Sequence, residues 1–330
     1  MGLEAVAWSD DRFTEWAAAL SDRFEVRLQE ALATSDEFVQ QAARYLVDLG
    51  GKRLRPALIF GVGGLGAEVG TADPASLLEA AVVVELTHAA TLYHDDVMDE
   101  AQLRRGAPTA HRLWGNSVAI MVGDFMLAQA SLVGAHLGSE FMIFHAITLG
   151  RLVQGQIAET RGPADGADPF AHYLDVIAGK TASLFAASAR YGATFAGLPQ
   201  SQVEDLTAFG ENLGMAFQLA DDLLDIVSEE SGKQPGTDLR EGVPTVVPLL
   251  VRRANRVEDG RLLELLSAPV AEDDVPEALA LLRAHPAVEE TRAEIRAWAN
   301  RAAGCLDSLD DLAATRALRT LCDQAATRLA

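Results

Sequence analysis

The apolar residues of the chain recur at helical spacing over most of its length, and the alternating runs typical of strands hardly occur. Asp73-Pro74 is a helix start signal, and the glycine and proline of 106–108 are a stop signal. The pattern predicts helices over 76–100, 117–137, 141–159 and 201–226, and a helix pair over 170–196. The remainder after 245 also has a helical pattern. The sequence therefore predicts an all-α protein.

Two segments share the pattern Asp-Asp-x-x-Asp, 95–99 and 221–225. On a helix the first and last aspartates share a face, about 6 Å apart along the axis. Two carboxylates this close repel each other unless a cation lies between them. Magnesium fits, since it binds one or two carboxylates and completes its shell with water and substrate phosphate. A solvated acidic face is the alternative, but both motifs are embedded in apolar sequence. A paired magnesium site is therefore the preferred interpretation.

The segment 228–245 contains three glycines and two prolines and is predicted to be a long loop, which is often functional. Breaks are also predicted at 161–169 and 267–277. Because the two aspartate motifs lie far apart in the sequence and must meet to form one site, a single helical domain over 1–330 is predicted.

The chain is acidic, with 27 Lys and Arg against 48 Asp and Glu and a net charge of −21. Such a protein repels nucleic acid and anionic membranes, so an anion site needs its own local cations. Basic residues do lie near the motifs, in the segments 50–56 and 103–106, at Lys180 and at Lys233. Each alone is more often a surface charge. Together they indicate a diphosphate site, because Lys and Arg bind phosphate by charge-assisted hydrogen bonds.

Other features are less specific. His88 lies two turns before Asp95, where it could donate to a phosphate or be a core histidine, and His94 points about 100° away and is interpreted as structural. The two cysteines, Cys305 and Cys322, fit reduced packing thiols. The N-terminus has no signal-peptide pattern, and the apolar stretch 80–93 is interrupted by charge, so we expect no transmembrane segment and a cytoplasmic location.

The chain resembles a known family, the trans-isoprenyl diphosphate synthases, especially the bacterial polyprenyl (heptaprenyl-like) diphosphate synthases. The two aspartate motifs and Gly-Lys-Arg-Leu-Arg-Pro are the most specific matches. The matching segments are 50–56, 85–116, 122–130, 179–193, 215–226 and 232–248. The resemblance implies a helical bundle, the isoprenoid synthase fold, around a deep central active-site cavity, and a homodimer.

The resemblance also implies residue roles. Three magnesium ions are expected, bound by Asp95, Asp99 and Asp221, with Asp96, Asp222 and Asp225 in supporting roles. Isopentenyl diphosphate would be held by Lys52, Arg55, His88 and Arg105. The allylic diphosphate would face Arg104, Lys180, Thr181, Gln218 and Lys233. Many relatives have Gly-Lys-x-Thr where this chain has 242–245, so the lysine contact is lost at Val243, and Arg240 is a possible substitute.

The implied reaction is the Mg-assisted ionisation of an allylic diphosphate, condensation with isopentenyl diphosphate and loss of a proton. In this family, bulky aromatic residues one turn before the first motif close the product pocket. Thr87, Ala90 and Thr91 are small here, which predicts an all-trans product in the heptaprenyl to decaprenyl range. Transient membrane contact is expected for product release.

Four alternatives stay open at this point. The first is a geranylgeranyl diphosphate synthase, which differs only in product length. The second is a terpene cyclase, which would not need a second aspartate motif. The third is a non-catalytic subunit of a heteromeric prenyl synthase, which should have lost motif residues. The last is a helical cation-binding protein without catalysis, which leaves the basic segments unexplained.

Overall fold

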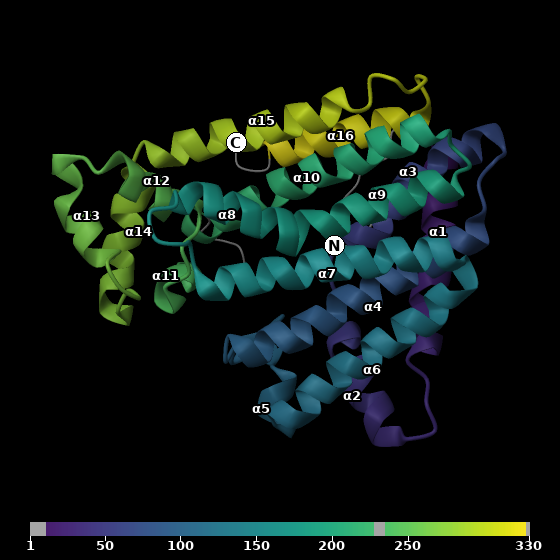
Figure 1. Cartoon of the computed structure of the whole chain (residues 1–330), viewed down its shortest axis with the longest axis horizontal. Coiled ribbons are helices and arrows are strands. Elements are labelled where there is room, and N and C mark those ends of the chain that lie inside the picture. The colour runs from purple at the N-terminus through teal and green to yellow at the C-terminus, as the bar shows by residue number, and fades with distance from the viewer. Residues whose placement is uncertain (1–10, 228–234, 328–330) are drawn as a thin grey trace. The chain divides into compact units, whose positions relative to one another are not determined.

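The computed structural model describes residues 11–227 and 235–327, and it is helical almost throughout (Figure 1). This confirms the all-α prediction. The longer helices are α1 (Asp11–Ala31), α2 (Glu37–Asp48), α3 (Leu54–Val69), α4 (Pro74–Met98), α6 (Asn116–Gly134), α7 (Ser139–Arg161), α8 (Pro169–Ile177), α9 (Ser183–Phe195), α10 (Gln200–Val227), α12 (Val246–Ala254), α14 (Val275–Ala284), α15 (Ala287–Gly304) and α16 (Ala313–Thr327). Shorter helices are α5 (Ala110–Trp114), α11 (Thr237–Glu241) and α13 (Gly260–Leu265), and a π-helical segment, η3 (Ala178–Ala182), joins α8 to α9.

The chain divides into two compact units. The first contains the described residues up to Leu149 together with Ala187–Thr207 and Ser308–Arg319. The second contains Gly150–Ala186, Ala208–Asp307 and the described residues from Thr320. The expectation of a single domain around a central cavity remains a prediction.

The core of the first unit is built around α4. The carboxylate of Asp73 caps the helix by accepting hydrogen bonds from the amides of Ala75 and Ser76, and Pro74 occupies its first turn. The helix packs against α1, α3 and α6 and is buried on nearly all sides, which explains its continuous apolar sequence. The start signal and the periodicity therefore predicted this helix correctly.

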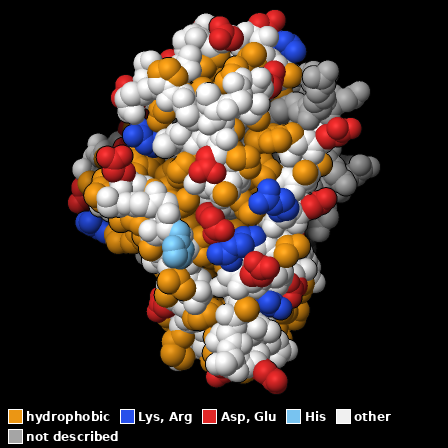
Figure 2. Space-filling view, turned by 90° about the vertical axis from the view of Figure 1, so that its right-hand side faces the viewer, with side chains coloured by type: hydrophobic (Ala, Val, Ile, Leu, Met, Phe, Trp, Pro, Cys, Tyr) orange, Lys and Arg blue, Asp and Glu red, His pale blue; other side chains and the backbone are white. Residues whose placement is uncertain are grey.

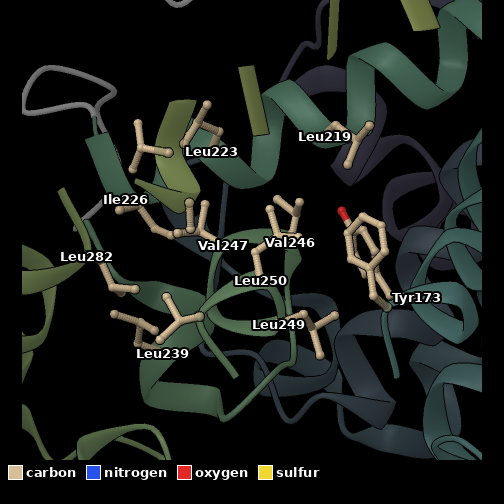
Figure 3. Close-up of a cluster of buried hydrophobic side chains, with 14 of the residues drawn as sticks. Tyr173, Leu219, Leu223, Ile226, Leu239, Val246, Val247, Leu249, Leu250 and Leu282 are labelled. Carbon is tan, nitrogen blue, oxygen red and sulfur yellow. The ribbon is translucent and has the colours of Figure 1, made fainter. Parts of the chain in front are cut away.

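The core of the second unit gathers leucine and valine side chains from α10, α11, α12 and α14 (Figure 3). Tyr173 of α8 borders the same cluster, close to Leu219 of α10 and Leu249 of α12. This core supports the end of α10, where the second aspartate motif lies.

Two expectations about local structure need correction. The stretch 228–245 was predicted as a loop, but α11 forms within it, with glycines of positive φ, Gly236 and Gly242, at its two ends. A small antiparallel hairpin, β1 (Leu103–Arg104) with β2 (Ala107–Pro108), follows α4 where only a helix stop was predicted. Strands of two residues are too short to give an alternating pattern.

Among the described residues, two helices are long and apolar enough to cross a membrane by length and composition, Pro74–Met98 and Asn116–Leu137. From the sequence, only the stretch 80–93 within the first helix was considered as a membrane span, and the second helix was not. The most apolar window of Pro74–Met98 is 67% buried, as expected for a core helix, whereas that of Asn116–Leu137 is 39% buried. Apolar side chains do lie exposed among charged ones on the face shown in Figure 2. Composition alone is weak evidence for a membrane span.

Candidate active site

The first aspartate motif lies at the carboxyl end of α4, in the first unit. Asp96 is buried, with 3% of its surface exposed, whereas Asp95 is half-buried and Asp99 is exposed. One carboxylate oxygen of Asp96 accepts a hydrogen bond from Nε of Arg104 at 2.7 Å and lies 2.6 Å from its Nη2. The negative charge of Asp96 is therefore compensated by Arg104 inside the protein. Asp95 and Asp99, one helical turn apart, are the more accessible carboxylates of the motif.

The hairpin after the motif holds the two arginines in place. Its turn residues, Arg105 and Gly106, have φ values of 54° and 78°, the positive values that a two-residue type I′ turn requires. Nη1 of Arg105 donates a hydrogen bond to the carbonyl of Leu46 at 2.8 Å. A Cβ at Gly51 would lie 2.8 Å from Nη2 of Arg105, so glycine makes room for this guanidinium. The role of Arg104 at the allylic diphosphate remains a prediction, because here its guanidinium contacts Asp96.

The basic segment before α3 is anchored by a glutamate that sequence reasoning missed. Nη1 of Arg53 lies 2.6 Å from the buried carboxylate of Glu85 on α4, and its Nε lies 2.8 Å from Glu25. Burial acts to lower the pKa of Arg53, but the two glutamates outweigh it and raise the pKa. Burial lowers the pKa of Arg55 to about 10, although the charge of Glu85 opposes this shift. Lys52, in contrast, is exposed. The interruption of an apolar helix by Glu85 was the signal available in the sequence.

His88 is placed among these cations. Its burial lowers its pKa well below the usual value, and Arg55 and Arg105 lower it further, followed by Arg104 and Arg53. The imidazole is therefore neutral near pH 7 and can donate one hydrogen bond. A neutral donor under the influence of arginine charges is chemically suited to a phosphate group, and the role of His88 at isopentenyl diphosphate remains a prediction.

The three predicted chain-length residues lie on α4. Thr87 and Ala90 are fully buried, and Thr91 is half-buried with its hydroxyl donating to the carbonyl of His88 at 2.8 Å. The hydroxyl of Thr87 donates to the carbonyl of residue 83 and lies 3.1 Å from Nε2 of buried His145 on α7. The Thr87 oxygen must therefore accept from the Nε2–H of His145. That these residues line the path of the product tail remains a prediction.

His94 faces α6 rather than the aspartate motif. Its Nε2 lies 3.1 Å from the carbonyl oxygen of Ile120 and 3.4 Å from the carboxylate of Asp124. A Cβ at Gly123 would lie 2.3 Å from the His94 ring, so the ring packs directly on the α6 backbone. These contacts support the structural interpretation of His94.

The second aspartate motif lies near the carboxyl end of α10, in the second unit. Asp222 is buried, and its two oxygens accept hydrogen bonds from the hydroxyl of Tyr173 at 2.6 Å and from Nε2 of Gln218 at 2.7 Å. Burial raises the pKa of Asp222 to about 6 although both donors oppose this shift. The carboxylate of Asp225 accepts from two amides at the start of α11. Within the described residues, Asp221 has no hydrogen-bond or ion-pair partner.

Lys180 and Thr181 lie in the π-helical segment η3 rather than in the middle of a regular helix. Single π-turns inside α-helices often occur at functional sites. A Cβ at Gly155 of α7 would lie 2.6 Å from the backbone nitrogen of Lys180, so glycine lets the two helices approach closely. Nζ of Lys180 lies 2.6 Å from the carboxylate of Glu159, a partner that the sequence analysis missed. Thr181 donates to the amide oxygen of Gln218 at 2.8 Å.

Two expectations concern the chain after α10. Lys233 lies outside the described residues. Arg240 was considered as a substitute for the lysine missing at Val243, but its Nε lies 2.6 Å from Glu272 and its Nη1 donates to the carbonyl of Pro235 at 2.7 Å. Its guanidinium is therefore occupied within the second unit. A role for Arg240 at a diphosphate would require it to leave these contacts.

The residues present suit magnesium better than a metal ion whose ligands all come from protein side chains. Within the described residues, no group of three or more His, Cys, Asp or Glu side chains is arranged to hold a metal ion. Magnesium needs only one or two carboxylates, with water and phosphate oxygens as further ligands. In both motifs the second aspartate is held by protein donors. That Asp95 and Asp99 of the first motif and Asp221 of the second would hold magnesium remains a prediction.

Comparisons with known proteins identify the family. The family described as polyprenyl synthetase matches residues 36–282. A nonaprenyl diphosphate synthase of Mycobacterium tuberculosis is 45% identical over 310 residues, which cover 93% of this chain and 91% of that protein. The crystal structure of a geranylgeranyl pyrophosphate synthase from Corynebacterium glutamicum, complexed with calcium and isoprenyl diphosphate, is 36% identical, has a TM-score of 0.88 and covers 98% of this chain and 99% of that one. A polyprenyl synthase from Caulobacter crescentus, also complexed with calcium and isoprenyl diphosphate, is 32% identical, has a TM-score of 0.87 and covers 97% and 98%. The chain therefore belongs to the polyprenyl synthetase family of prenyltransferases, which confirms the resemblance seen in its sequence.

Proposed function

We propose that the protein condenses isopentenyl diphosphate with an allylic diphosphate in a magnesium-dependent reaction that yields a long all-trans polyprenyl diphosphate. The observation that carries this proposal is the matching state of the two aspartate motifs. In each, the second aspartate is buried and satisfied by protein donors, Asp96 by Arg104 and Asp222 by Tyr173 and Gln218. In both motifs the first aspartate is less buried than the second, and we assign Asp95 and Asp221 to the metal.

The residues of the first unit suit the recognition of isopentenyl diphosphate. The charges of Arg55 and Arg105 help to lower the pKa of His88, and Arg53 at the start of α3 is paired with Glu85. Arginine binds a diphosphate through paired N–H groups, and His88 adds one neutral donor. These groups would hold the attacking double bond in position, which is catalysis by orientation.

The residues of the second unit suit the leaving diphosphate. Asp221 would contribute to the metal site, and Lys180 would contact phosphate oxygens, whereas the hydroxyl of Thr181 already donates to Gln218. Magnesium, when bound, neutralises the charge that develops on the departing diphosphate. The π-helical segment positions the backbone of Lys180, and its ammonium would have to leave the ion pair with Glu159 to reach a phosphate. We assign the proton lost after condensation to the released diphosphate, because this polyanion is a base that the reaction itself supplies.

The product range follows from small side chains on α4. Thr87, Ala90 and Thr91 present no aromatic ring within two turns of Asp95 on that face, which favours the heptaprenyl to decaprenyl range. The 45% identical M. tuberculosis relative, a nonaprenyl diphosphate synthase, supports this range. Geranylgeranyl diphosphate is the second candidate, and the C. glutamicum structure favours it.

We also propose a homodimer. The helix α7 exposes Ile143 and Ile147, which lie one turn apart on one face, and α6 exposes Ile120 and Met121. Apolar side chains in such a row are typical of an interface between subunits. A second copy of the chain would also cover the poorly buried α6.

Replacement of Asp221 by alanine tests the proposed function, with turnover measured from isopentenyl diphosphate and an allylic primer. We expect a loss of about 100-fold or more, since a metal ligand is removed. EDTA should abolish turnover of the unchanged protein. Asp36→Ala, which removes a helix cap in the first unit, serves as a control for general destabilisation. Turnover that persists in EDTA would contradict the proposal.

A further inference from the structure

We propose that Tyr173 is a positioning residue for the second aspartate motif, holding Asp222 inside the core so that Asp221 is the carboxylate this motif offers to the metal and its diphosphate. This inference rests on the proposed function and deepens it. Tyr173 was not among the residues singled out in the sequence. It reaches Asp222 from 49 positions away along the chain.

Both oxygens of Asp222 are already used inside the protein. Oδ2 accepts from the Tyr173 hydroxyl at 2.6 Å, and Oδ1 accepts from Nε2 of Gln218 at 2.7 Å. Only 7% of the surface of Asp222 is exposed. A buried carboxylate with two short hydrogen bonds on different oxygens has a fixed orientation. Asp222 therefore cannot turn toward a ligand without breaking one of these bonds.

Tyr173 is itself held rigidly. Its ring packs in the core of the second unit, with its hydroxyl directed toward α10 (Figure 3). The helix α8 that carries it is capped by Asp168, which accepts from the amide of Phe170, and the guanidinium of Arg253 lies 4.6 Å from the centre of the Phe170 ring. On the side of α7, Nε2 of His172 lies 3.1 Å from the carbonyl of Ala158. A tyrosine on such a support can fix the position of its partner.

The hydrogen bonds continue from Asp222 to the π-helical segment. Thr181 donates to Oε1 of Gln218, and the same amide donates through Nε2 to Asp222. Both bonds require this orientation of the amide, because a flipped amide would place an oxygen against the carboxylate. Tyr173 and Thr181 thus hold the two ends of one chain of hydrogen bonds that passes through α10. Asp221, adjacent to Asp222, is oriented by the helix that this chain fixes.

Tyr173→Phe tests the inference, because it removes the hydroxyl and keeps the ring in the core. The readout is the affinity of the full chain for Mg²⁺ in the presence of inorganic diphosphate, measured by calorimetry. We expect about tenfold weaker binding, the usual effect of losing a group that orients a metal ligand. In turnover, the half-saturating Mg²⁺ concentration should rise similarly, with the KM for isopentenyl diphosphate unchanged.

Two further variants separate positioning from a general structural role. Tyr191→Phe removes another buried tyrosine hydroxyl, in the first unit, and should leave Mg²⁺ affinity within twofold of the unchanged protein. Asp222→Asn should weaken Mg²⁺ binding less than Asp221→Asn does. The double variant Tyr173→Phe with Asp222→Ala should be no weaker than Asp222→Ala alone, because Asp222→Ala already removes the acceptor of the Tyr173 hydroxyl.

The outcomes that overturn the inference are distinct from those that overturn the proposed function. If the unchanged protein binds Mg²⁺ with diphosphate and Tyr173→Phe binds it equally well, Tyr173 has no positioning role. Equal weakening in Tyr191→Phe, or additive effects in the double variant, would also contradict it. An unchanged protein that binds no Mg²⁺ with diphosphate would overturn the proposed function, and this inference with it.

Discussion

Arg104 and Asp96 form an ion pair in which the guanidinium Nη2 lies 2.6 Å from a buried carboxylate oxygen. The arginine comes from the hairpin after α4, and the aspartate comes from the last turn of α4. The pair explains how one aspartate of an acidic motif can be buried near two others. It also ties the hairpin, and so Arg105, to the end of α4.

Removal of Arg104 should destabilise the protein, because it leaves the buried charge of Asp96 without its partner. We expect Arg104→Ala to lower the free energy of unfolding by about 2 kcal/mol, since a hydrogen bond to a buried charged group is lost. Chemical denaturation measures this change. Arg112→Ala, which alters an exposed arginine of α5, should change stability little. Equal stability of both variants would show that the ion pair contributes nothing.

Thr91→Phe should shorten the product. The ring would lie one turn before Asp95, where the growing tail is predicted to pass, and Thr91 is half-buried, so the change should be tolerated. Mass analysis of dephosphorylated products gives the length. Ala75→Phe, at an exposed position in the first turn of the same helix, should leave the length unchanged. An unaltered product in Thr91→Phe would remove the role assigned to this face of α4.

Buried His145 should make stability fall in mild acid. Burial lowers its pKa to about 4, whereas an unfolded histidine titrates near the ordinary value of 6.5. Between these values the unfolded chain binds the additional proton, so stability is complete above pH 6.5 and is lost as the pH falls toward 4. The loss should be about 3 kcal/mol from this group. In His145→Gln, denaturation curves between pH 7 and pH 4 should shift less than in the unchanged protein, and equal shifts would contradict this assignment.

Ile147→Glu should produce a monomer. A carboxylate in the exposed isoleucine row of α7 would be buried without a partner in a dimer. Light scattering coupled to size-exclusion chromatography measures the mass. Val257→Glu, at an almost fully exposed position of the second unit, should leave the mass unchanged. If the unchanged protein is already monomeric, the proposed interface is wrong.

The sequence predicted those features whose signals are local. The cap at Asp73-Pro74 and the apolar periodicity located α4, and the doubled aspartate pattern located both motifs. The partners of those residues could not be predicted in the same way. Glu85 reaches Arg53 from 32 positions away, and Lys180 reaches Glu159 across 21. Such contacts depend on how helices pack, which periodicity does not specify.

Only the family resemblance distinguished the aspartates within each motif, because the residue pattern by itself did not. The three aspartates of each five-residue motif look equivalent in the residue pattern. In the structure, however, Asp222 accepts hydrogen bonds from Tyr173 and Gln218, whereas Asp221 does not. Which side of a helix faces the core depends on its neighbours, α8 in this case. The short α11 was missed for a related reason. A helix of five residues has too few turns to show periodicity.

The most direct measurement is the product distribution from isopentenyl diphosphate, Mg²⁺ and a panel of allylic primers, analysed by mass spectrometry after dephosphorylation. We predict polyprenols in the heptaprenyl to decaprenyl range, which disappear with EDTA and in Asp95→Ala. Geranylgeraniol as the final product would confirm the reaction and contradict the assigned length. No elongation with any primer, from a folded protein that binds diphosphate, would contradict the central claim and favour a non-catalytic subunit.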